Sequence, residues 1–147
     1  MDSGEQTVKI ESEANVKTYI QKLKYALDHG AKISFQIERR VDEQRKICYT
    51  NKFTVAELFP SENPVEALKR ELKTITVENY LRTVKDFRFS DRSDMWEFGK
   101  IYNGKDVYIK IRVELLSPSG FEHTAFVMSF HFAEYPFKNE DFPYRKK

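Results

Sequence analysis

The sequence predicts a single α+β domain in which helices come first and an antiparallel β-sheet follows. Apolar residues recur at helical spacing in the first half of the chain, and three β-rich runs follow: MWEFGKIY, KDVYIKIRVELL and TAFVMSFHF. Asn103-Gly104 separates the first two runs. This pair favours the type I′ turn of a β-hairpin, because both central residues of that turn need positive φ. The length of 147 residues fits one domain.

The N-terminal part predicts one long helix and a short β-hairpin. The apolar residues between 15 and 29 fall on one helical face, and Gly30 is expected to end the helix. The run KISFQIE alternates and predicts a strand, RRVDEQR predicts a charged turn, and KICYTNKF predicts a return strand. Residues 1–12 are expected to be flexible, and residues 13–147 to form the domain.

Two shorter helices are predicted from capping signals. In TVAELF, Thr54 and Glu57 fit a capping box. In NPVEALKREL, Asn63 fits an N-cap and Pro64 fits the first helical position, and the apolar face is expected to hold Val65, Leu68 and Leu72. The run TVENYLRTVKDF is predicted to be a short helical or extended piece, and the tail AEYPFKNEDFPYRKK to be irregular.

The composition indicates a cytoplasmic protein. The single cysteine, Cys48, cannot form an intrachain disulfide, which suits a reducing compartment. No apolar run approaches the length of a membrane span, and the polar N-terminus does not read as a signal peptide. We find no metal-ligand spacing, glycine-rich phosphate loop or nucleophile elbow, so no metal or other cofactor is expected.

The hairpin turn also predicts which residues share a face of the sheet. If Asn103 and Gly104 are the loop residues, residues whose numbers sum to 207 lie opposite each other and project to one side. Gly99 then leaves open space before the ring of its partner, Tyr108. One face carries Glu97, Tyr108, Lys110 and Arg112, and the other packs on the helices through Trp96, Phe98, Val107, Ile109 and Ile111.

The third β-rich run is expected to add a histidine to the polar face. Strict alternation turns one set of side chains to the core: Phe126, Met128, Phe130 and Phe132. The other set then joins the polar face: Val127, Ser129 and His131. The assembled face would hold a histidine, a carboxylate, a phenol and two cations.

That combination suits cleavage of RNA without a metal. Histidine exchanges protons near neutral pH, and lysine and arginine can stabilise the charge of the transition state. Tyrosine can stack on a base, which contributes about 1–3 kcal/mol. The same face also has an ordinary explanation. Glu97 opposite Lys110 can be a cross-strand ion pair that contributes less than about 1 kcal/mol, and His131 can be structural.

A resemblance supports the functional interpretation. The run MWEFGKIYNGKDVYIKI followed by VMSFHFAEYPF resembles toxins of the MqsR (motility quorum-sensing regulator) type, in the RelE-like superfamily of mRNA interferases. The similarity spans residues 54–137 and is sharpest from Met95 to Glu134. It implies a RelE-like small domain, with N-terminal helices packed on a twisted antiparallel β-sheet. It also implies metal-independent endoribonuclease cleavage of single-stranded mRNA, and a cognate antitoxin protein as partner.

The resemblance carries over to four positions. The family's functional lysine, eleven residues before the tryptophan, matches Lys85, and its strand tyrosine matches Tyr108. Its glutamine after the tryptophan falls on Glu97, and its lysine after the final Ser-Phe falls on His131. Glu97 and His131 transfer protons better than the residues that they replace. Residues 13–50 have no counterpart in the family and are candidates to cover the site, bind the antitoxin or mediate a homodimer.

These arguments assign a role to each residue of the predicted site. His131 is the general acid or base, Glu97 is the complementary proton-transfer or orienting group, and Tyr108 orients the nucleotide or stacks on it. Lys85 and Lys110 are expected to stabilise the negative charge of the transition state. Arg112 and Lys100 are expected to bind flanking phosphates of mRNA that is free or ribosome-bound, although alternation turns Lys100 to the core.

Two other functions remain open on the sequence alone. One is a catalytically inactive module of the same fold that binds RNA or a protein through this face. The other is a phage- or defence-related regulator that acts by protein–protein contact. RNA cleavage separates the enzyme from both. A steep loss of affinity with salt separates an RNA binder from a protein binder.

Overall fold

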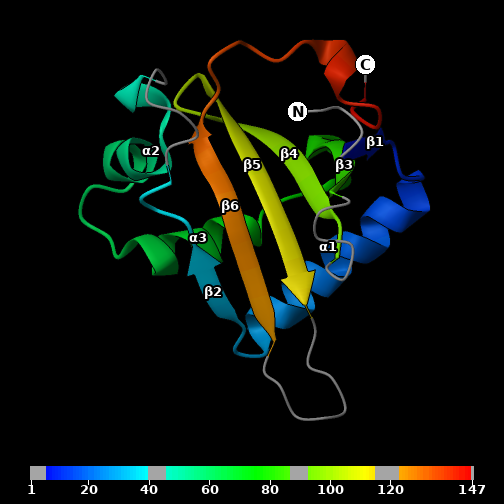
Figure 1. Cartoon of the computed structure of the whole chain (residues 1–147), viewed down its shortest axis with the longest axis horizontal. Coiled ribbons are helices and arrows are strands. Elements are labelled where there is room, and N and C mark those ends of the chain that lie inside the picture. The colour runs from blue at the N-terminus through cyan, green and yellow to red at the C-terminus, as the bar shows by residue number, and fades with distance from the viewer. Residues whose placement is uncertain (1–5, 40–45, 87–92, 115–122, 147) are drawn as a thin grey trace.

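A six-stranded β-sheet with helices on one face forms the framework of the protein (Figure 1). The computed structural model describes residues 6–39, 46–86, 93–114 and 123–146. The helices are α1 (Glu13–Asp28), α2 (Asn51–Leu58) and α3 (Pro64–Leu72). The strands are β1 (Gln6–Lys9), β2 (Lys32–Phe35), β3 (Tyr80–Asp86), β4 (Met95–Tyr102), β5 (Lys105–Glu114) and β6 (Thr124–Phe132). The α+β class is therefore confirmed.

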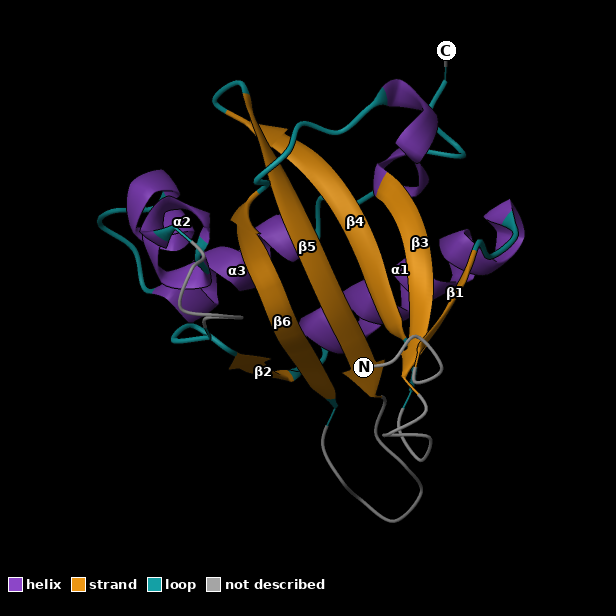
Figure 2. Cartoon of the chain, turned by 45° about the horizontal axis from the view of Figure 1, so that its top comes forward, coloured by secondary structure: helices purple, strands orange, loops and turns teal. Residues whose placement is uncertain are grey.

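The sheet has the order β1-β3-β4-β5-β6-β2. All neighbouring strands are antiparallel except β2 and β6, which are parallel. Helices α1 and α3 lie behind the sheet, and α2 lies at the β6 side (Figure 2). Within the described part of the chain, no α-helix covers the other face of β3 to β6, and we call it the open face.

The predicted first helix is confirmed as α1. Its N-cap is Ser12, whose side chain accepts a hydrogen bond from the backbone N–H of Asn15 at 3.1 Å. Gly30 follows with φ of +78°, a conformation that favours glycine after a helix. The residues of its predicted apolar face are all buried: Val16, Tyr19, Ile20, Leu23, Ala26 and Leu27. Residues 13–35 therefore belong to the helix layer and the sheet edge, and they do not cover the open face.

Helix α3 is confirmed with Asn63 as its N-cap, but its apolar face is shifted. The Asn63 side chain accepts from the N–H groups of Val65 and Glu66. Val65 is exposed, whereas Leu68 and Leu72 are buried as expected and Ala67 joins them.

Three predicted local features are wrong. Gln6–Lys9 form the edge strand β1, although residues 1–12 were expected to be flexible. Pairing with the free backbone of β3 needs no apolar signal, so the sequence did not reveal this strand. KICYTNKF forms a 3₁₀ turn at Ile47–Tyr49 and then α2, not a return strand. Thr50 caps α2, which places Thr54 inside the helix instead of at its start. The predicted turn RRVDEQR lies largely outside the described residues.

The hairpin prediction is confirmed in conformation and register. Asn103 and Gly104 have φ of 53° and 80°. Glu97 pairs with Lys110, Gly99 with Tyr108, and Trp96 with Ile111. On the helix-facing side of the hairpin, the ring of Trp96 stacks on Tyr19 of α1, with ring centroids 3.9 Å apart.

A bulge in β6 overturns half of the predicted alternation. Lys110 pairs with Ser129 but Ile111 pairs with Val127, so Met128 is an extra residue. An extra residue reverses the faces on one side of the bulge. Beyond it, Phe130 faces the core and His131 the open face, as predicted. Before it the prediction is wrong, because Ala125 and Val127 are fully buried and Phe126 contacts Arg112 on the open face.

The C-terminal segment packs on the open face and fills the space expected at Gly99. A Cβ atom on Gly99 would lie 2.6 Å from the ring of Phe137 and 3.0 Å from that of Phe142. Asp106 holds this segment, since its backbone oxygen accepts from the Ala133 N–H and its carboxylate from the Phe137 N–H, both at 2.9 Å. The predicted irregular tail contains one 3₁₀ turn, Asn139–Asp141.

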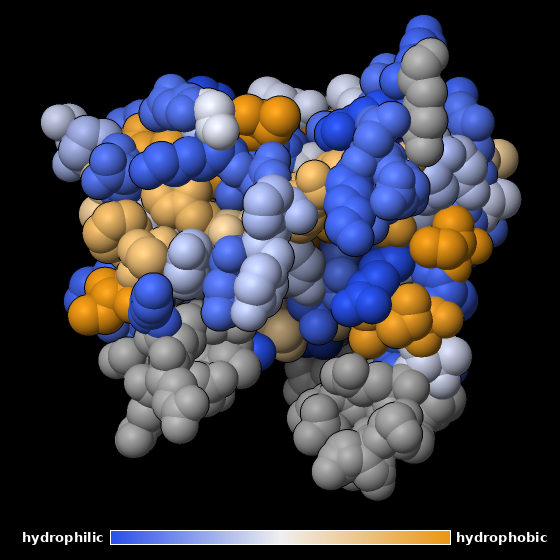
Figure 3. Space-filling model, turned by 90° about the horizontal axis from the view of Figure 1, so that it is seen from above, coloured by the Kyte–Doolittle hydropathy of each residue, from blue (hydrophilic) through white to orange (hydrophobic). Residues whose placement is uncertain are grey.

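Seen from the end that carries the C-terminal segment, hydrophobic residues gather on the α2 side (Figure 3, left), where Ile47 and Phe53 are exposed. Among the described residues, no helix combines the length and apolar character needed to cross a membrane.

Candidate functional site

A pocket of about 420 Å³ lies where the ends of β5 and β6 meet the C-terminal segment. We call it the His131 pocket. Its walls come from the open face and from residues 133–137. Its polar and charged lining residues are Arg39, Tyr108, Lys110, Ser129, His131, Glu134 and Tyr135. The structure therefore gathers three of the predicted site residues, His131, Tyr108 and Lys110, around one hollow.

The His131 ring has a defined orientation within this pocket. Its Nδ1 atom lies 2.9 Å from the backbone oxygen of Phe132. A carbonyl oxygen only accepts hydrogen bonds, so we assign the Nδ1 proton to this contact. In the neutral ring, Nε2 then carries the lone pair that can accept a proton. The Tyr108 ring lies beside the imidazole, with centroids 5.4 Å apart.

Tyr108 occupies a largely buried position between the strands that carry His131 and Gly99. Burial raises the pKa of its phenol, and the neighbouring Glu97 carboxylate raises that pKa further. The phenol therefore stays protonated at neutral pH. It can donate a hydrogen bond or present its ring to a ligand, but it is a poor general base.

Two cations supply positive charge to the His131 pocket. Lys110 projects from β5, and its side chain is 17% exposed. Arg39, which follows β2, lines the pocket from the other side and was missed by the sequence analysis. Arg112 also lies on the open face, but farther along β5. There it contacts the Phe126 ring at 4.8 Å and pairs with Glu114, so it lies outside the pocket.

Glu97 lies away from His131 and is buried on the open face beneath other side chains. It is only 2% exposed, and its Oε1 accepts from Arg82 Nε at 2.8 Å. Glu97 is on β4 and His131 is two strands away on β6, and their side chains belong to neighbouring rows of paired residues. This spacing places their Cα atoms roughly 12 Å apart. The predicted complementary proton transfer between these two residues is therefore not supported by the geometry.

The second carboxylate oxygen of Glu97 is incompletely satisfied. Oε2 lies 3.8 Å from Lys110 Nζ, an ion-pair distance, and among the described residues it accepts no hydrogen bond. A buried oxygen without a donor destabilises a fold by about 1–3 kcal/mol. Glu97 thus fixes Arg82 and Lys110 but retains the capacity to accept one more donor.

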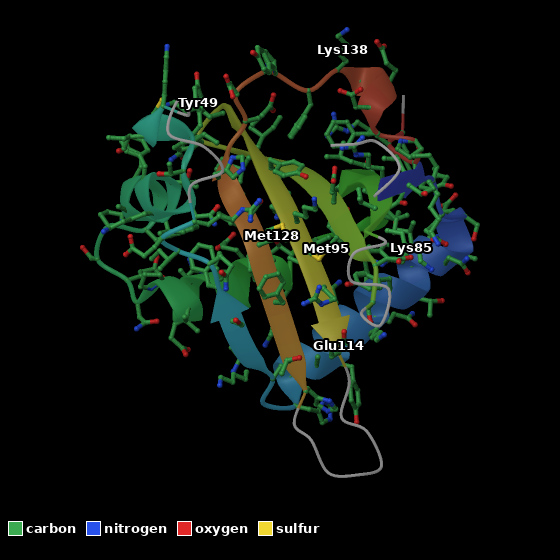
Figure 4. The ribbon with its side chains drawn as sticks, in the orientation of Figure 1. Tyr49, Lys85, Met95, Glu114, Met128 and Lys138 are labelled. Atoms are coloured by element: carbon green, nitrogen blue, oxygen red, sulfur yellow. The ribbon has the colours of Figure 1, made fainter. Side chains whose placement is uncertain are left out.

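Two predicted lysines lie away from the pocket. Thr83 on β3 pairs with Trp96 and faces the helices. Lys85 is two residues further along β3, so alternation turns its side chain to the same side. Figure 4 shows it at the β1 side of the sheet, distant from Met128 on β6. Lys100 donates to the Thr74 hydroxyl and lies over the Tyr102 ring on the helix side. Neither residue can act with His131.

Comparisons with known proteins leave the family of this chain unassigned. No protein-family model, no curated protein and no solved structure matches it. The implications of the MqsR resemblance therefore remain predictions, and the described site is what bears on function. Among the described residues, no group of three or more histidine, cysteine, aspartate or glutamate side chains is arranged to hold a metal ion.

Proposed function

We propose that this chain is a toxin-like endoribonuclease that cleaves single-stranded RNA through His131. The observation that carries the proposal is the His131 pocket. It combines an oriented imidazole, two cations and a protonated tyrosine in a volume of about 420 Å³. Pockets of this size bind small molecules, and a nucleotide with its phosphate has the matching chemistry.

The proposed reaction uses the RNA's own 2′-hydroxyl as the nucleophile. His131 Nε2 takes the hydroxyl proton, the 2′-oxygen bonds to the adjacent phosphorus, and the bond from phosphorus to the 5′-oxygen breaks. The leaving oxygen takes a proton from water in the open pocket, which Glu134 at the rim can hold. The products are a 2′,3′-cyclic phosphate and a 5′-hydroxyl end.

The remaining pocket residues act on charge and position. Lys110 and Arg39 face the phosphate oxygens, on which negative charge increases in the transition state. Tyr108 supplies a ring for stacking and a hydroxyl donor. Glu97 acts indirectly, since its ion pair helps to hold Lys110 in place. By the resemblance, the substrate is mRNA, free or on the ribosome, and a cognate antitoxin protein neutralises the activity.

A second candidate is an inactive binding module of the same fold. Lys85 lies on the other face and Glu97 pairs with Arg82, so these two of the four expected catalytic residues are not in the His131 pocket. Such a module would hold RNA or a protein through the same residues without cutting it. A protein–protein regulator is the remaining alternative.

The deciding experiment is cleavage of a long single-stranded RNA in EDTA, with and without ribosomes. We expect discrete cuts by the wild type, and a loss of about 10²–10⁴-fold in rate for His131→Ala. His29→Ala is the matched control, because His29 lies at the end of α1 and far from the pocket in the fold. Lys110→Ala should slow cleavage, whereas Lys85→Ala should not.

Each other result has a defined meaning. Intact RNA with the folded wild type would reject the enzyme and favour the binding module. Equal cleavage by the wild type and by His131→Ala would show that the cleavage does not depend on His131. It would then come from another site or from a contaminating nuclease.

A further inference from the structure

A second pocket, of about 400 Å³, lies on the other side of Tyr108. We call it the Glu97 pocket. It shares two walls with the His131 pocket, Tyr108 and Phe137, so the two hollows are neighbours. A ligand that places a phosphate in one pocket can therefore reach the other with an adjoining group.

The two pockets differ in charge. Among its described lining residues, the His131 pocket has two cations, Arg39 and Lys110, and one carboxylate, that of Glu134. The described lining of the Glu97 pocket has the reverse balance, with one guanidinium, that of Arg82, and three carboxylates: Glu97, Glu140 and Asp141. A phosphate therefore favours the first pocket. The second suits a group that donates hydrogen bonds, and its described carboxyl groups are not arranged for a metal ion.

Glu97 lines this pocket, and one of its carboxylate oxygens, Oε2, is buried just behind the pocket wall without a hydrogen-bond donor among the described residues. Glu97 is only 2% exposed, and its Oε2 accepts no hydrogen bond from the described residues. A ligand N–H that reached this oxygen would satisfy it. Arg82 holds the other oxygen with a side chain that is 48% exposed, so this side chain can turn outward to admit a ligand.

We infer that the Glu97 pocket is a guanine-specific subsite for the nucleotide whose phosphate lies in the His131 pocket, an inference that rests on the proposed function. Guanine is the one standard base whose Watson–Crick edge presents two adjacent donors, N1–H and the N2 amino group. Adenine and cytosine place a ring acceptor beside their amino group, and uracil places its N–H between two carbonyls. A carboxylate therefore attracts the guanine edge and repels part of the others. The rings of Tyr108 and Phe137 supply apolar walls for the base.

The test compares the binding of guanosine 3′-monophosphate and inosine 3′-monophosphate by isothermal titration calorimetry. Inosine lacks only the N2 amino group, so the phosphate contacts are the same for both ligands. We expect wild type to bind the guanosine nucleotide about tenfold more tightly or better, as for a hydrogen bond to a charged group. In Glu97→Gln this ratio should approach one. Glu57→Gln, an exposed change on α2, is the control and should keep the wild-type ratio.

The outcomes separate this inference from the proposed function. Equal affinities of the wild type for the two nucleotides would overturn the guanine subsite, and RNA cleavage would still decide the enzyme. No binding of either nucleotide would also overturn it. The wild-type comparison needs no variant, so the inference stays testable even if Glu97→Gln fails to fold. His131→Ala should lose cleavage but retain the preference for guanosine.

Discussion

Asn51 should be among the most important polar residues for stability, because its side chain fixes the bulge that orients His131. It is 2% exposed at the start of α2. Its Nδ2 donates to the backbone oxygens of Gln36 at 2.7 Å and Met128 at 3.0 Å. Its Oδ1 accepts from the backbone N–H of Phe130 at 2.9 Å. One side chain thus binds the backbone oxygen of the extra residue, Met128, and the backbone N–H of Phe130 beyond it.

Asn51→Ala removes all three hydrogen bonds at once. The Phe130 N–H is left buried without an acceptor, which costs about 1–3 kcal/mol, and each carbonyl adds about 1 kcal/mol. We therefore expect the free energy of unfolding to fall by about 3–5 kcal/mol. Alanine is a good helix former, so the change does not weaken α2 itself. Such a loss is large beside a total stability of about 5–15 kcal/mol.

Urea denaturation followed by Trp96 fluorescence measures this loss. The midpoint should fall while the slope stays constant, since the area exposed on unfolding is unchanged. Asn15→Ala is the control, because Asn15 is exposed and its Nδ2 donates to the exposed side chain of Glu11. It should change stability by less than about 0.5 kcal/mol. A loss below about 1 kcal/mol for Asn51→Ala would refute the view that this side chain holds the bulge.

Two further predictions concern the walls of the pockets. Gly99→Ala should lower the free energy of unfolding by about 1–3 kcal/mol in a thermal melt, because its Cβ would overlap the Phe137 ring. The loss should shrink when Phe137→Ala is the background, and an equal loss would contradict the contact. Tyr108→Phe should flatten the fall of stability at alkaline pH. The pKa of Tyr108 is raised above its ordinary value of 10.0, so its contribution is intact below pH 10.0 and is lost as the pH rises above it. Identical slopes for the two proteins above that pH would contradict this.

The local sequence was sufficient for structures that depend on neighbours in the chain. Asn103-Gly104 determined the turn and the register of β4 on β5, and so placed Tyr108 and Lys110 on one face. The apolar spacing of α1 and the Asn63 cap of α3 were likewise readable, because helix periodicity and capping are local. His131 was assigned to the correct face because it follows the bulge.

Tertiary contacts decided the features that local patterns could not contain. The bulge at Met128 depends on Asn51, 77 positions away in the chain, and it reversed the faces of Phe126 and Val127. Strict alternation has no means of showing such an inserted residue. The prediction of a return strand was wrong for the same reason. Strand β2 borders β6 only as far as Phe35 and Val127, and beyond that point side chains of α2 bind the β6 backbone.

The site shows the same division between local and distant information. The sequence determined that a histidine, a tyrosine and a lysine occupy one face of the sheet. Only the tertiary structure decided that Arg39 and the C-terminal segment enclose them, that Glu97 is buried beneath Arg82, and that Lys85 lies elsewhere. A pocket is formed by segments distant in the chain, and the spacing of residues within one segment carries no information about how distant segments meet.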